Sequence, residues 1–157
     1  MSKQDGSKQK LSAWLIYHSR SGHTEKFAQT IAAHLGELPL AVKVSRCDEA
    51  EPQELPRHDV IILGSPTYFG NMSAELKGFV DRSISVYRQL VDKRGAVFAT
   101  AGGASDLEKC LTCLGWALEI HGIKVLARAG LTDRVGDTER EEAARRFATD
   151  LRHKLNL

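Results

Sequence analysis

Short apolar runs alternate along the chain with segments in which apolar residues recur every three or four positions. Continuous runs of this length predict buried β-strands, and the wider spacing predicts amphipathic helices. The expected strands are residues 11–17, 40–45, 59–64, 95–100 and 123–129. Because a helical segment follows each strand in turn, the pattern predicts an α/β fold with a parallel sheet and helices on both faces.

The expected helices differ in how clearly their ends are marked. The third is expected to open at the sequence SDLE with a capping box between Ser105 and Glu108. The last is expected to begin near Asp137 or Thr138, and the proline-bearing stretch 49–57 allows at most a short helix. One face of the second helix is expected to carry Leu76, Phe79, Val80, Ser83 and Tyr87.

The strands also indicate their order in the sheet. The first, third and fourth strands are continuously apolar, as strands buried on both faces should be. The second and fifth interleave Lys or Arg with apolar residues, which is typical of edge strands. The predicted order is therefore the doubly wound 2-1-3-4-5. Its ligand crevice lies beyond the carboxyl ends of the first and third strands.

Two polar segments follow these two strands and should meet in that crevice. The first comprises Ser19, Arg20, Ser21, Gly22, His23 and Thr24, and the second comprises Pro66, Thr67, Tyr68, Phe69, Gly70 and Asn71. Hydroxyl groups and backbone N–H groups at a helix start can bind a compact anion such as a phosphate. A plain helix cap is the alternative interpretation of the first segment.

The kind of phosphate can be narrowed further. The dinucleotide pattern G-x-G-x-x-G is absent from the first turn, and so is the P-loop pattern that ends in Gly-Lys-Ser/Thr. The short turn SRSGHT therefore suits a terminal monophosphate better than a pyrophosphate.

At this point the sequence resembles a known family. SRSGHT resembles the FMN-phosphate loop of flavodoxin-like proteins. GSPTYFGNMSAELKGFVDR, residues 64–82, resembles the second flavin loop and following helix of the NAD(P)H:quinone oxidoreductases related to tryptophan-repressor-binding protein. The resemblance runs from about residue 11 to the C-terminus and implies a flavodoxin-like fold. The chain length predicts a single domain, residues 11–157, and the polar N-terminus, residues 1–10, is expected to be a short disordered tail.

The resemblance also implies roles for individual residues. The first segment would bind the FMN phosphate, with Arg20 and His23 adding positive charge, and the second would line the isoalloxazine ring. A third flavin loop would contain Thr100, Ala101, Gly102 and Gly103, whose N–H groups would reach the pyrimidine edge of the ring. Tyr68 and Phe69 could instead be packing residues, and the two glycines could form only a turn.

Three functions follow as hypotheses. The preferred one is an FMN-dependent oxidoreductase that transfers hydride from NAD(P)H to a quinone or similar small acceptor. The alternative is a flavodoxin-type carrier that passes single electrons between protein partners. A third is an interaction protein that keeps the fold and binds flavin weakly or not at all. No catalytic side chain is expected, because a bound flavin would carry the chemistry.

Charge and composition favour the enzyme among these hypotheses. Flavodoxin carriers are usually strongly acidic, whereas this chain of 157 residues has a net charge of +2. The third loop, ATAGGASD, lacks the aromatic residue with which carriers tend to shield the flavin. The chain also departs from the quinone reductase pattern. Its third loop looks shorter, and the segments that help those enzymes form tetramers are missing. Tyr68 stands where a basic residue is expected in the second loop. A homodimer is expected instead.

The remaining composition excludes several classes. The small net charge gives no indication of a nucleic-acid partner. No run approaches the roughly 18 apolar residues of a membrane-spanning helix, and a cytoplasmic location is expected. Cys110 and Cys113 have the spacing of a redox or metal motif, but they fall in mid-helix and no second cysteine pair completes a zinc site. They are therefore interpreted as buried apolar residues, and no metal is expected.

Overall fold

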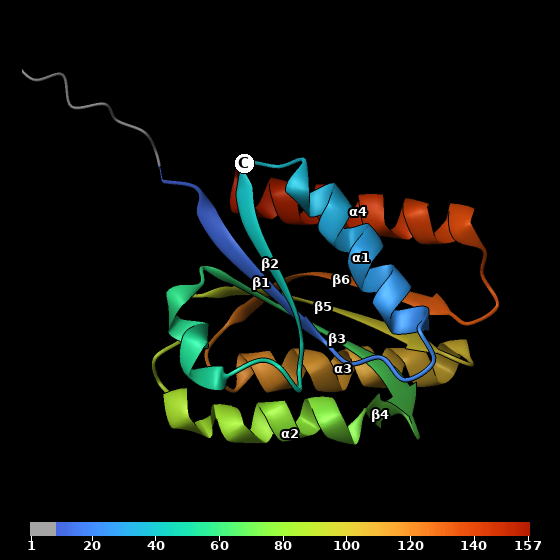
Figure 1. Cartoon of the computed structure of the whole chain (residues 1–157), viewed down its shortest axis with the longest axis horizontal. Coiled ribbons are helices and arrows are strands. Elements are labelled where there is room, and N and C mark those ends of the chain that lie inside the picture. Colours follow the sequence, from blue (N-terminus) through green and yellow to red (C-terminus); the bar gives the residue numbers. More distant parts are fainter. Residues whose placement is uncertain (1–8) are drawn as a thin grey trace, which may run out of the picture.

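The computed structural model describes residues 9–157 (Figure 1). The predicted tail falls largely on residues 1–8, which lie outside the described part. The strands are β1 (Leu11–Tyr17), β2 (Leu40–Arg46), β3 (Val60–Tyr68), β4 (Asn71–Met72), β5 (Arg94–Ala101) and β6 (Lys124–Thr132). The α-helices are α1 (His23–Gly36), α2 (Ala74–Arg82), α3 (Ala104–Glu119) and α4 (Asp137–Leu155). The 3₁₀-helices are η1 (Pro52–Arg57) and η2 (Ser83–Val86).

The sheet has the predicted order. Its five parallel strands run β2-β1-β3-β5-β6, and the short β4 pairs antiparallel with the end of β3. The strands with interleaved basic residues, β2 and β6, lie at the two edges as expected. The connection reverses between β1 and β3, so the carboxyl ends of these two strands flank the expected crevice.

The sheet lies between two helical layers, each with its own core. In Figure 1, α1 and α4 cover one face, and α2 and α3 cover the other. Along β1, Trp14 and Ile16 join the core beneath α2 and α3, whereas Leu15 packs beneath α1 and α4. Burial on both faces explains the unbroken apolar run, because successive side chains of a strand point to opposite faces.

Three local predictions need correction. The helix α3 begins at Ala104 behind an extended Gly103, so Ser105 lies inside the helix and no capping box forms; Glu108 pairs instead with Arg128 of β6. The second helix ends at Arg82 and continues as η2 to Val86, so Tyr87 lies outside the helix on whose face it was expected, and it is exposed.

The third correction concerns β3, which was expected to end at Gly64. It extends to Tyr68 because its last residues pair with β4. Residues 66–68 therefore belong to a strand and not to a loop. The short helix expected in residues 49–57 is present as η1, and α4 begins at Asp137 as predicted. Within residues 9–157, none of the helices is both long and apolar enough to span a bilayer.

Candidate cofactor site

The three segments singled out in the sequence lie at one end of the sheet. The β1–α1 loop, the β3–β4 hairpin and the β5–α3 loop all follow the carboxyl ends of central strands (Figure 1). A direct contact joins the first segment to the third: Thr24 Oγ1 and Thr100 Oγ1 are hydrogen-bonded at 2.8 Å, and both residues are buried. One hydroxyl donates this bond, and the other retains its proton for another acceptor.

The first loop is held in shape by its own polar groups. Ser19 Oγ accepts hydrogen bonds of 3.2 Å from the backbone N–H groups of Gly22 and Glu25. From the end of β2, Arg46 donates a 3.1 Å bond to the Ser19 carbonyl. Gly22 has φ +98°, a left-handed conformation that favours glycine. The turn into α1 is therefore a built structure that needs both a serine and a glycine at these positions.

This loop leaves backbone donors free. For the N–H groups of Arg20, Ser21, His23 and Thr24, the structure shows no protein acceptor within residues 9–157. Unpaired N–H groups at the start of a helix carry partial positive charge and bind anions. The side chains of Arg20, Ser21 and His23 are exposed around them, whereas that of Ser19 is buried.

A hydrogen bond between the buried Tyr17 and the partly exposed Glu25 joins the end of β1 to the start of α1. Tyr17 at the end of β1 donates a 2.8 Å hydrogen bond to the Glu25 carboxylate in the first turn of α1. Burial, and then the adjacent carboxylate, raise the pKa of Tyr17 above its ordinary value. The hydrogen bond ties the end of β1 to the first turn of α1. Sequence patterns did not reveal this pair, because its members serve the loop without belonging to the motif.

The second segment forms a tight hairpin. Tyr68 pairs with Asn71, and the two residues between them, Phe69 and Gly70, have φ values of +51° and +74°. Positive φ at both central positions is the geometry of a type I′ turn, which matches the twist of the flanking strands. Glycine adopts it readily, but phenylalanine in this conformation is strained. The hairpin thus stores strain at Phe69.

Phe69 also projects fully into solvent, with 107% relative exposure. Tyr68 beside it is 37% exposed. A strained and fully exposed aromatic side chain stabilises the fold no more than a polar residue would. Strained positions of this kind cluster at ligand-binding sites. The packing interpretation is thus wrong for Phe69.

Two buried serines anchor the base of the hairpin. Ser65 Oγ accepts a 2.9 Å bond from the Ser73 N–H, and Ser73 Oγ in turn caps α2 by accepting from the Leu76 N–H. Both serines are completely buried. The hydroxyl of Thr67 is also buried and has no hydrogen-bond partner within the described residues. Ser65 and Ser73 were not predicted as site residues, although both lie within residues 64–82, because their role depends on the closed hairpin.

The third segment is less specific. Thr100 and Ala101 are the buried last residues of β5, and Gly102 and Gly103 connect the strand to α3. A side chain added at either glycine would meet open space, and neither has a positive φ. Neither the protein's packing nor its backbone conformation demands glycine here. Close approach of a ligand to the backbone would demand glycine. The two glycines therefore favour the binding interpretation over a simple turn.

Cys110 and Cys113 make no hydrogen bond to the free N–H groups of the first loop. Cys110 is buried with its Sγ 3.9 Å from the Pro66 carbonyl, and burial raises the pKa of its thiol to about 11. Cys113 is half-buried, so the expectation of two buried cysteines is confirmed only for Cys110. Within residues 9–157, no group of three or more His, Cys, Asp and Glu side chains is arranged to hold a metal ion.

Comparison with known protein families assigns the chain to one of them. Residues 14–131 match the flavodoxin domain family Flavodoxin_5, which is three quarters of the sequence. The chain therefore belongs to the flavodoxin-like family of FMN-binding proteins.

Solved structures agree with this assignment. Flavodoxin 2 from Bacillus cereus is 25% identical, with a TM-score of 0.82 over 91% of this chain and 99% of that one. Flavodoxin 1 from the same organism is 26% identical, with a TM-score of 0.77 over 90% and 98%. A WrbA-like protein from Agrobacterium tumefaciens is 23% identical, with a TM-score of 0.73 over 91% and 98%, and this likeness shows the fold alone. The finer prediction of kinship with quinone reductases is therefore not shown by these comparisons.

Proposed function

We propose that this chain is an FMN-binding electron carrier of the flavodoxin type, which takes single electrons from one protein partner and gives them to another. The observation that carries the proposal is the convergence of the first loop, the strained hairpin and the third loop at the end of the sheet, tied by the bond between Thr24 and Thr100. Family membership and the flavodoxins among its structural relatives support the carrier more than the enzyme that the sequence favoured.

The residues of the first loop fit the phosphate of FMN. The free N–H groups of residues 20, 21, 23 and 24 supply donors, and the start of α1 supplies partial positive charge. The side chains of Ser21 and Arg20 are exposed beside these donors and can add a hydroxyl and a guanidinium. Ser19 has a different role in this proposal. Its Oγ accepts hydrogen bonds from the loop, and its hydroxyl proton is free to be donated to the phosphate.

The hairpin and the third loop fit the ring. Phe69 and Tyr68 offer aromatic faces that the folded protein leaves exposed, and stacking on a flat ring would bury them. The open backbone at Gly102 and Gly103 admits the polar edge of the ring to hydrogen-bonding distance. FMN, when bound, supplies a ring system that accepts and releases electrons one at a time. The protein's contribution is to bind this ring, orient it and leave an edge accessible to partners.

A second function has a specific observation in its favour. The third loop carries no aromatic side chain, and the chain lacks the acidic excess of typical carriers. An uncovered ring face would admit a nicotinamide, so hydride transfer from NAD(P)H to a quinone-like acceptor is the competing proposal.

One anaerobic experiment separates these functions. The FMN-loaded chain is mixed with one equivalent of NADPH or NADH, and a second sample is titrated electrochemically. A carrier should keep its visible flavin absorption with both nucleotides and give two resolved one-electron potentials. Rapid loss of the absorption with either nucleotide would instead establish the reductase. A chain that binds no FMN would be neither, and the interaction protein would remain.

A further inference from the structure

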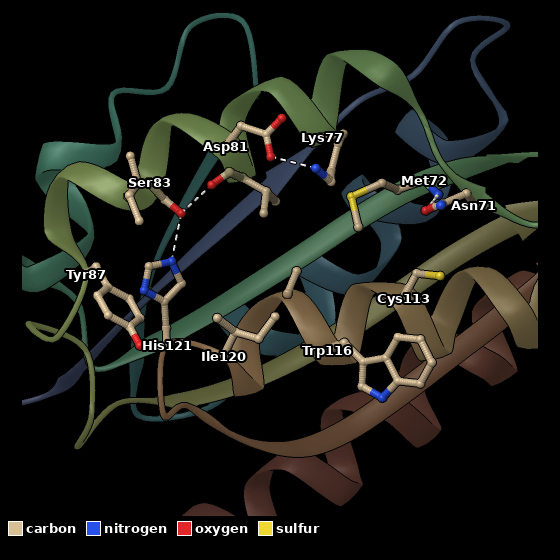
Figure 2. A pocket seen from close by; sticks show the side chains of 13 residues that line it. Asn71, Met72, Lys77, Asp81, Ser83, Tyr87, Cys113, Trp116, Ile120 and His121 are labelled. Carbon is tan, nitrogen blue, oxygen red and sulfur yellow. Dashed lines mark hydrogen bonds and ion pairs between the residues drawn. The ribbon is translucent and has the colours of Figure 1, made fainter.

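A pair of buried polar side chains outside the cofactor site joins the end of α2 to the end of α3. Ser83 is the first residue of η2, directly after α2, and His121 lies two residues beyond α3. Figure 2 shows the Ser83 hydroxyl above the imidazole of His121, with the Tyr87 ring beside it. Ser83 Oγ lies 2.7 Å from His121 Nε2, and both residues are buried. The contact therefore connects two elements from inside the protein.

The hydrogen bonds of Ser83 determine which nitrogen of the imidazole carries the hydrogen. Ser83 Oγ lies 2.6 Å from the Val80 carbonyl oxygen, which can only accept, so Ser83 donates its single hydroxyl proton there. Ser83 Oγ then accepts from His121, and Nε2 carries the hydrogen. The lone pair of the neutral ring is therefore on Nδ1. That atom is buried and has no hydrogen-bond partner within residues 9–157.

The surroundings of His121 are apolar. The Tyr87 ring is tilted against the imidazole at a centroid separation of 6.0 Å, and Leu90, Leu118 and Ile123 line the same small cavity. A proton on Nδ1 would add a charge and a second donor where nothing accepts the hydrogen bond. Burial accordingly lowers the pKa of His121 below its ordinary value of 6.5.

The charged groups near His121 do not offset this cost. A groove of about 600 Å³ between α2 and α3 is lined by both His121 and the pair of Lys77 with Asp81, whose charges are 2.6 Å apart and satisfy each other. No charged group within the described part of the chain contributes to the lowered pKa of His121. The titratable groups on the elements packed around it are Lys77 and Asp81 of α2, Tyr87 and Arg88 after η2, and Cys113 of α3.

The segment that covers His121, residues 83–91, is only lightly held by other contacts. Of its large apolar side chains, Val86 and Leu90 are buried, and the other three expose between 44% and 70% of their surface. Arg88 has φ +73°, a left-handed conformation that is strained for a residue with a side chain. Segments with few buried contacts open locally at a lower cost than global unfolding. The hydrogen bond from His121 is thus a substantial part of what keeps this segment closed.

We infer that His121 is a pH-sensitive latch, which holds residues 83–91 closed while the imidazole is neutral and releases them when it is protonated. Opening the segment exposes Nδ1 to water, which accepts the hydrogen bond that the closed protein cannot accept. The open state therefore takes up the proton more readily, and acid favours opening. Because burial lowers the pKa of His121 in the closed state, the closed state should lose stability as the pH falls below 6.5. The latch belongs to none of the three cofactor segments, so this inference is independent of the proposed function.

Native-state hydrogen exchange of the full chain, followed by NMR between pH 7 and 5, tests the latch. The reporters are the N–H groups of Tyr87 and Gln89, which donate to the carbonyls of Ile84 and Val86 inside the segment. If only the open state binds the proton, the opening equilibrium constant rises up to about tenfold for each pH unit below 6.5. We therefore expect the protection factors of both amides to fall about tenfold from pH 6 to pH 5, beyond any fall at Ile16 in β1.

A matched variant isolates the imidazole. His121→Gln keeps a side-chain N–H that can donate to Ser83 but does not titrate, so the protection of both reporter amides should be independent of pH in this range. His153→Gln, at an exposed histidine of α4, is the control and should behave as the wild type does. The same loss of protection in His121→Gln as in the wild type would overturn the inference.

The wild-type chain provides a second test that does not depend on the folding of a variant. The ring signals of His121 should report protonation only below pH 6.5, and the change should accompany the loss of protection at the two reporter amides. A ring that is protonated while both amides stay protected would overturn the inference. Protection that stays unchanged down to pH 5 would overturn it as well.

Discussion

The first loop and the β3–β4 hairpin lie at the same end of the sheet, yet they are built in opposite ways. In the first loop, polar side chains bond to the loop itself, and the free groups are backbone donors. In the hairpin, the backbone is paired and strained, and the free groups are the aromatic side chains Tyr68 and Phe69. The difference fits the proposed division of labour, in which the loop would bind the phosphate and the hairpin would bind the flat ring.

The largest expected effect is on the phosphate side. Ser21→Asp places a carboxylate among the free N–H groups, and we expect FMN affinity to fall about 100-fold or more. Affinity for riboflavin, which has the ring but no phosphate, should hardly change. Calorimetric titration of both ligands measures this, with Ser85→Asp on η2 as a control of equal charge. Equal losses for the two ligands would contradict the assignment of the loop.

A smaller effect is expected on the ring side. Phe69→Ala removes an aromatic contact, and we expect the affinities for FMN and riboflavin to fall by the same factor of about 10. Phe69→Tyr should restore both, because it keeps the aromatic face. Ile84→Ala, at an exposed apolar residue of η2 that belongs to none of the three segments, serves as the control in the same titrations. If only FMN binding suffers, the hairpin does not contact the ring.

The strain at Phe69 gives a prediction for the protein without flavin. Because the side chain is fully exposed and φ is +51°, Phe69→Gly should raise the free energy of unfolding by about 1 kcal/mol. Urea unfolding of the flavin-free chain measures it. The matched variant Tyr68→Gly lies on a paired strand and should lose stability. A loss in Phe69→Gly would mean that the ring packs against the protein.

The smallest expected effect is on the pH dependence of stability, through one buried thiol next to the first loop and one next to the hairpin. Cys47 N–H bonds to the Tyr17 carbonyl behind the first loop, and Cys110 lies behind the hairpin; burial raises the pKa of each thiol to about 11. An unperturbed thiol, as in the unfolded chain, has a pKa of 9.0, whereas the folded thiols keep their protons up to about pH 11. Stability should therefore be lost as pH rises from about 9 to 11, by under about 1 kcal/mol for each thiol at pH 9.5.

Urea unfolding at pH 7 and 9.5 measures this loss. Cys47→Ala and Cys110→Ala should each flatten the pH dependence, whereas Cys113→Ala, at a half-buried position, should change it least. An unchanged slope in both of the first two variants would show that these thiols titrate normally.

The sequence predicted the sheet well because burial on both faces leaves a clear mark in the composition of a strand. The continuous apolar runs of β1, β3 and β5 and the basic residues of β2 and β6 are sufficient to assign the order. Local signals failed where a distant partner decides the structure. Glu108 pairs with Arg128 rather than capping its helix, and β3 extends through Tyr68 only because β4 folds back on it.

The site was predictable in part for the same reason. The three segments were recognisable from their residue types, and the topology brings them together as expected. The bond between Thr24 and Thr100, the serine anchors of the hairpin and the pair of Tyr17 with Glu25 were not predictable, since each joins residues whose contact depends on the folded chain.

The central claim is that three separate segments form one FMN site. The most direct test is to follow backbone amide resonances of the full chain by NMR during addition of FMN. The account predicts that the largest shifts fall on residues 20–24, 67–71 and 101–103, and that they saturate together at one equivalent. Shifts concentrated outside these three segments, or no saturable shifts, would contradict it.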